Sequence, residues 1–77
     1  MKTVEEEFTQ ILNFMGIPND EIRNEASFAK DYGFDELQFI CLALYIGIHF
    51  KINFKHVDYE KLDTVGDAID FVKIKMH

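Results

Sequence analysis

The chain has 77 residues, which is enough for one domain and leaves no room for a second. Hydrophobic residues make up 48% of the sequence, with eight Phe and three Tyr against a single Pro, and this composition argues against a disordered chain and for a packed core. The formal net charge of −6 argues against nucleic acid and anionic membrane surfaces as partners, because both would repel the chain.

A first helix is expected over residues 4–15. Thr3 and Glu6 fit a capping box, in which the two side chains satisfy each other's backbone N–H groups. Apolar residues then recur at three- and four-residue spacing, and Gly16 followed by Ile17-Pro18 ends the run. The expected apolar stripe comprises Val4, Phe8, Ile11, Leu12 and Met15.

The periodicity weakens between Pro18 and Phe34, which predicts a long structured loop held in place by its apolar residues. Asp35 and Gln38 fit a second capping box, so a second helix should begin at Asp35 and run to about Phe50.

A short turn of helix is expected around residues 56–61, and Thr64 with Asp67 fits a capping box for a last helix. The inner stripe of that helix would be Val65, Ala68, Ile69 and Val72, with Phe71 at its flank. The sequence therefore predicts one all-α domain over residues 1–77, a small bundle of three main helices plus one short helix, with a long loop between helices one and two. The expected core includes Phe8, Phe28, Leu42, Ile46, Phe50, Ala68 and Ile69.

The second helix is unusually apolar, because no charged residue lies between Glu36 and Lys51 except for a possible charge on His49. At 3.6 residues per turn, the apolar residues of this helix fall into two stripes. The first is sufficient for a core face and comprises Phe39, Leu42, Ala43, Ile46 and Phe50; the second lies almost opposite and comprises Leu37, Cys41, Leu44 and Ile48. So small a bundle cannot cover a helix all round, which predicts an exposed interface stripe. The alternative is a tilted helix that the long loop covers more fully. The apolar stretch is shorter than the roughly 20 residues that a membrane span needs.

Gly47, within this helix, has two interpretations. It would let a partner backbone approach closely, or it is a tolerated helix glycine that costs about 1 kcal/mol relative to Ala.

No catalytic or metal-binding set is expected. The spacings of His49, His56 and His77 match no short ligand motif, and Cys41 has only apolar neighbours that would not activate a thiol. The paired acidic residues fall in helix caps and first helical turns. Their favourable effect at a helix N-terminus accounts for them without acid–base catalysis or calcium binding. The sequence thus gives no support for an enzyme, and its single cysteine and acidic N-terminal segment favour a cytoplasmic protein.

The order of these signals resembles the acyl carrier protein family over nearly the whole chain. Two stretches carry the resemblance: "GFDEL" at residues 33–37, which opens the second helix, and "KLDTVGDAIDFV" at residues 61–72. Phe28 and Phe50 also fall where the family places core aromatic residues.

The resemblance implies a carrier of acyl thioesters on a phosphopantetheine arm, attached to a serine between the Asp and the Leu of that turn. In this chain the surrounding motif is Gly33, Phe34, Asp35 and Leu37, and Glu36 occupies the serine position. A carboxylate there would form a labile mixed anhydride instead of a phosphodiester, so no phosphopantetheine cofactor is expected. Glu36 either mimics the charge of the missing phosphate at the helix N-terminus or is simply a favourable first-turn residue.

We therefore expect a non-carrying homologue that acts as a protein interaction module in a fatty-acid, polyketide or related lipid pathway. Its partner would be an enzyme or carrier protein of that pathway, or a second copy of the chain, and the sequence leaves this choice open. The alternative is an acyl carrier or acyl-chain-binding protein that holds its ligand non-covalently inside the bundle. The expected partner contacts are Leu37, Cys41, Leu44, Tyr45 and Ile48.

Overall fold

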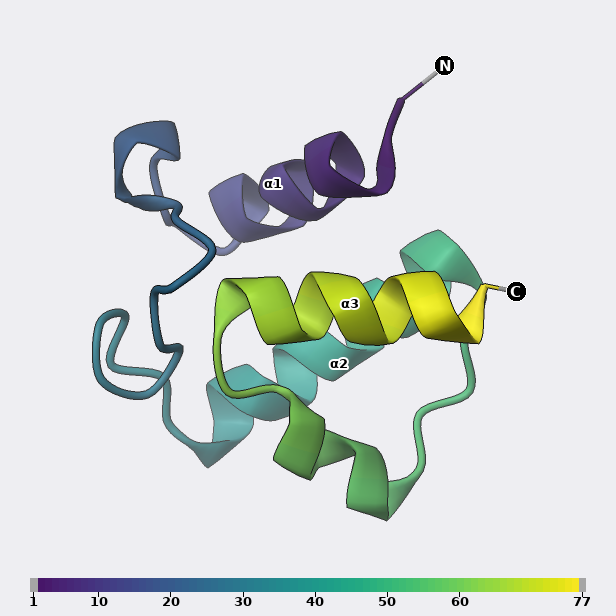
Figure 1. Ribbon diagram of the computed structural model, residues 1–77. Helices are drawn as coiled ribbons and strands as arrows, with labels where there is room; N and C mark the ends of the chain where they lie inside the picture. Colours follow the sequence, from purple (N-terminus) through teal and green to yellow (C-terminus); the bar gives the residue numbers. More distant parts are fainter. Residues whose placement is uncertain (1, 77) are drawn as a thin grey trace.

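The computed structural model describes residues 2–76, except for the side chain of His56. Three α-helices form a small compact bundle, α1 (Val4–Phe14), α2 (Glu36–Phe50) and α3 (Val65–Lys75), and α1 packs against both of the others (Figure 1). Residues 2–76 contain no β-strand. The expected all-helical fold with three main helices is therefore confirmed. Where a short fourth helix was expected, the structure has the 3₁₀ helix η2 (His56–Lys61), and a second 3₁₀ helix, η1 (Asn19–Glu21), lies in the long connection.

The starts of the three α-helices agree with their predicted caps. The side chains of Thr3, Asp35 and Thr64 accept hydrogen bonds from the backbone N–H groups of Glu6, Gln38 and Asp67, and each capping box is complete. These are local interactions between residues three positions apart, which is why the sequence alone locates them.

The core lies between the three helices and the inner side of the long connection. All seven residues expected in the core are buried, and Phe8, Phe28, Leu42, Ile46 and Ala68 have no exposed surface at all. Phe71, expected at the flank of the last helix, is also buried, and its ring lies 5.1 Å from that of Phe54.

The long connection of residues 15–35 is fastened to the start of α3. Ser27 and Thr64 form an isolated β-bridge, and the backbone N–H groups of Phe28 and Val65 donate to the carbonyls of Asp63 and Ala26 at 3.0 Å. The Gly66 N–H donates to the Asn24 carbonyl at 2.8 Å, and that carbonyl would lie only 3.1 Å from a Cβ on Gly66. This pairing fixes the path of a segment that has little regular structure of its own.

One exposed ion pair joins α1 to α3. The Lys73 ammonium donates to the Glu5 carboxylate at 2.6 Å. This hydrogen bond lowers the pKa of Glu5 and raises the pKa of Lys73. Both groups are exposed and screened by solvent, so the pair contributes little to stability.

Candidate functional site

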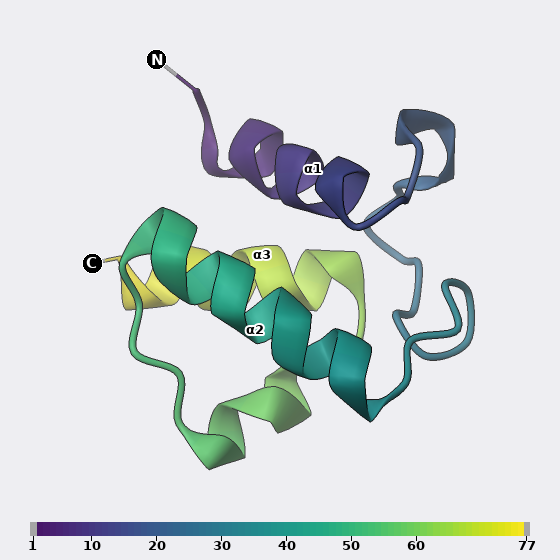
Figure 2. The same ribbon diagram turned by 180° about the vertical axis from the view of Figure 1, so that it is seen from behind.

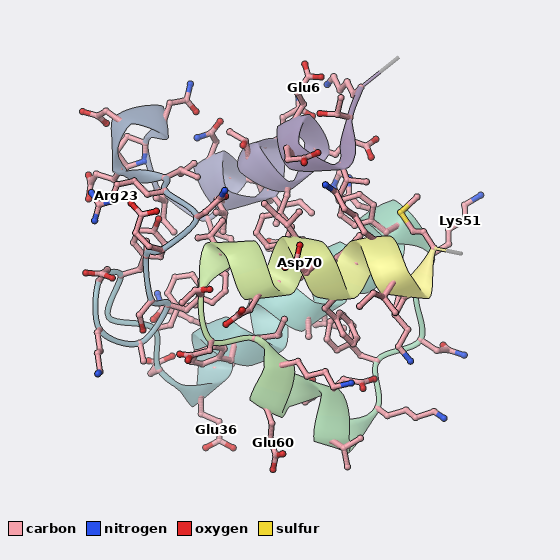
Figure 3. All side chains as sticks on the ribbon, in the orientation of Figure 1. Glu6, Arg23, Glu36, Lys51, Glu60 and Asp70 are labelled. Atoms are coloured by element: carbon pink, nitrogen blue, oxygen red, sulfur yellow. The ribbon has the colours of Figure 1, made fainter. Side chains whose placement is uncertain are left out.

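The amino end of α2 places Glu36 in solvent. The Asp35 carboxylate accepts from the Gln38 N–H at 2.9 Å, and the Gln38 side chain accepts from the Asp35 N–H at 3.0 Å. Glu36 is therefore the first helical residue, and Figure 3 shows its side chain pointing away from the protein. The position where the resemblance to acyl carrier proteins places the attachment serine is thus accessible, and in this chain it carries a carboxylate at the positive end of the helix dipole.

The chain enters this helix through a turn that is anchored in the core. Gly33 has a φ of +66°, which favours glycine, and the next residue, Phe34, is buried. The Phe34 N–H donates to the Phe28 carbonyl at 2.9 Å, and the two rings are stacked with centroids 5.4 Å apart. The aromatic core under the turn therefore fixes where α2 begins.

Three residues of the second apolar stripe are strongly exposed. Leu37, Leu44 and Ile48 have 67%, 59% and 73% of their surface accessible, and Cys41 between them is half-buried. Leu37, Cys41, Leu44 and Ile48 are called the outer stripe below. The opposite stripe faces the core, with Leu42, Ala43, Ile46 and Phe50 buried and Phe39 half-buried. The long connection lies at the amino end of α2 (Figure 2). The exposure of Leu37, Leu44 and Ile48 means that this connection leaves the outer stripe uncovered.

Tyr45 lies between the outer stripe and α1. It is half-buried, and its ring forms a T-shaped pair with that of Phe14, with centroids 5.3 Å apart. Phe14 is 76% exposed, so an apolar residue of α1 extends the exposed surface of α2. The sequence does contain a signal for Phe14, since it is a large apolar residue outside the inner stripe of the first helix.

A cleft of about 480 Å³ lies on the other side of α2, between the start of this helix and η2. It is lined mainly by apolar side chains, and Glu36 stands at its edge. The Glu36 and Glu60 side chains both point outward on this side of the protein (Figure 3), and of these two carboxylates only that of Glu36 lines the cleft. The lining residues are Glu36, Phe39, Ile40, Tyr59 and Leu62.

Sequence reasoning did not identify this cleft. Ile40 and Leu62 are 22 positions apart, and no local pattern brings α2 and η2 together. The only available signal is Ile40 itself, an additional apolar residue beside the outer stripe.

Gly47 faces its own chain. A Cβ at this position would lie 3.1 Å from the carbonyl oxygen of Ile52, and the Gly47 carbonyl accepts from the N–H groups of Lys51 and Ile52. The close backbone approach at Gly47 is therefore made by the turn after α2 and does not require a partner.

Within residues 2–76, the hydroxyls of Ser27, Tyr32 and Thr64 all lie away from the start of α2, where the resemblance places the attachment serine. The Ser27 hydroxyl accepts from the Lys30 N–H in the long connection, Thr64 caps α3, and the Tyr32 hydroxyl donates to the Glu21 carbonyl at 2.7 Å. Partial burial raises the pKa of Tyr32.

Among the described residues, no three His, Cys, Asp or Glu side chains are placed to hold a metal ion. Within residues 2–76, every helix also falls short of the length and apolarity needed to cross a membrane. No known protein-family model matches the sequence.

Proposed function

We propose that this protein is a non-carrying homologue of the acyl carrier proteins, which acts as an interaction module in a fatty-acid, polyketide or related lipid pathway. It docks a protein partner through the outer stripe of α2 and performs no catalysis. The observation that carries this proposal is the juxtaposition of Glu36, where the family has its attachment serine, with an exposed apolar helix face that begins at the next residue.

The exposed face supports docking because its apolar residues form one continuous line along the helix axis. Leu37, Leu44 and Ile48 lie along one side of a 15-residue helix, with Cys41 between them. Apolar residues scattered over a surface are ordinary, but a line of them along one helix is typical of a helix that packs against a partner. In the proposed function this line replaces the acidic face that acyl carrier proteins present to their enzymes.

The non-carrying part of the proposal is tested by intact mass. The native protein is incubated with coenzyme A and a permissive phosphopantetheinyl transferase, beside a Glu36→Ser variant. We expect no mass change in the native protein and the gain of one phosphopantetheine in the variant, because the variant restores a hydroxyl at an exposed helix start. Phosphopantetheine on the native chain would refute the non-carrying role. The same reaction with a known carrier protein serves as the control that the transferase is active.

The cleft supports a second candidate function, the non-covalent binding of an acyl chain. Its volume lies within the range of about 300–1,000 Å³ that is usual for small-molecule sites, and Phe39, Ile40 and Leu62 give it apolar walls. The carboxylate of Glu36 at the edge would disfavour an anionic head group, so a neutral acyl conjugate fits better than a free fatty acid.

This candidate predicts a selective ligand response in the cleft. Titration of delipidated protein with dodecanoyl-pantetheine should shift the NMR signals of Ile40 and Leu62, while dodecanoate should bind about tenfold more weakly because its carboxylate meets Glu36. An Ile40→Asp variant should lose the ligand-induced NMR shifts. Glu36→Gln should reduce the difference in affinity between dodecanoyl-pantetheine and dodecanoate. Unchanged spectra with both ligands would remove this function.

A further inference from the structure

We infer that the partner of the outer stripe is a second copy of this chain, with the two α2 helices packed antiparallel about a two-fold axis. This inference rests on the proposed function and names the partner that the function leaves open. It is carried by two independent properties of α2, the spacing of its exposed apolar residues and the distribution of its charges.

The spacing of the outer stripe is the same in both directions. Its residues are separated by four, three and four positions, so an inverted copy of the helix presents the same pattern. In an antiparallel pair, Leu37 lies opposite Ile48 of the second copy, and Cys41 lies opposite Leu44 of the second copy. A two-fold interface requires such a surface, because the same patch must complement itself.

The charges of α2 stand at its two ends with opposite signs. Glu36 is at the first position of the helix and Lys51 caps its end, and both side chains are exposed at opposite ends of α2 (Figure 3). Between them the helix has no Asp, Glu, Lys or Arg. An antiparallel second copy places Glu36 of each chain near Lys51 of the other, whereas a parallel copy brings like charges together. The helix dipoles also oppose each other in the antiparallel arrangement.

The area that the outer stripe can bury sets the expected stability of the dimer. An interface of usual size takes about a tenth of a small protein's surface, which is about 500 Å² of the 5225 Å² that this chain exposes. The outer stripe, extended by Tyr45 and Phe14, lies along a helix about 22 Å long and can supply an area of that order. Two such patches bury about 1,000 Å² in total, at the low end for specific complexes, so the dimer should be weak and dependent on concentration.

The test is sedimentation equilibrium from about 10 μM to about 1 mM on the native protein and on charge-reversed variants. The native protein should dimerise within this range. Glu36→Lys and Lys51→Glu should each weaken the dimer by about tenfold, since each places like charges at both ends of the pair. An equimolar mixture of the two variants should recover association, because Lys at position 36 of one chain then meets Glu at position 51 of the other.

Asp70→Lys is the matched control for Glu36→Lys, since it makes the same charge change at an exposed position of α3 and should leave the dimer dissociation constant unchanged within about twofold. Far-UV circular dichroism checks that each variant is folded. A native protein that stays monomeric up to about 1 mM overturns the inference, as does a mixture that associates no better than its components. Neither result touches the non-carrying module itself, which is refuted separately by phosphopantetheine on the native chain.

Discussion

Replacing both Leu44 and Ile48 with aspartate should abolish association through α2 and leave the fold intact. The two side chains are among the most exposed apolar groups of the protein, so the substitution removes no core contact. At an interface, however, each aspartate would be a charge buried without a partner, which costs several kcal/mol. We expect the dissociation constant to rise by at least about 100-fold, measured by sedimentation equilibrium beside thermal unfolding.

Ile74→Asp provides the matched control for this substitution. Ile74 is 72% exposed, much like Ile48, but it lies near the end of α3 instead of on the outer stripe. The control should associate as the native protein does, because it adds a charge away from the proposed interface. Undiminished association of the Leu44→Asp/Ile48→Asp double variant would contradict both the docking role of the outer stripe and its pairing with a second copy.

The helices and their caps could be predicted because the forces that set them are local. Thr3, Asp35 and Thr64 each cap a helix by contacting a residue three positions later, and the sequence shows both partners. The two faces of α2 could be predicted from the sequence in the same way, because the 3.6-residue period of a helix places Leu42 and Ile46 on one face and Leu44 and Ile48 on the other. The exposure of the outer stripe then follows from the small size of the chain, which has too few elements to cover both faces.

The cleft and the role of Gly47 could not be predicted because both depend on distant parts of the chain coming together. Ile40 lines the cleft only because η2 folds back beside the start of α2. Gly47 accepts a close backbone contact only because the chain reverses at Lys51, whose left-handed φ of 56° directs Ile52 back toward the helix. Lysine seldom adopts that conformation, so the residue type gave no sign of the turn.

Glu36 links the two surfaces of α2 that carry the proposals. It stands at the edge of the cleft and also at the negatively charged end of α2, one residue before Leu37 of the outer stripe. Its substitutions therefore separate the candidate functions: Glu36→Gln should improve binding of an anionic acyl ligand while it weakens the dimer. A single role for this carboxylate as a favourable first-turn residue predicts neither effect.

Phe28→Ala should destabilise the protein by about 3–5 kcal/mol, the usual cost of deleting a fully buried Phe side chain. A domain of this length has a free energy of unfolding of about 4–12 kcal/mol, so a large part of its stability would be lost. The reason is that Phe28 packs the long connection against α2: its ring contacts those of Tyr32 and Phe34 in the connection and that of Phe39 in α2.

Urea unfolding followed by circular dichroism measures this loss, and Phe14→Ala is the control, because Phe14 is 76% exposed and its truncation should cost no more than about 0.5 kcal/mol.

Hydrogen exchange adds a test of where the stability resides. Since Phe28 anchors the turn that sets the start of α2, the amides of Phe34 and Gln38 should lose protection before those of Leu12 in α1. Equal loss of protection in both places would mean that Phe28 supports the whole core without a special role in positioning Glu36.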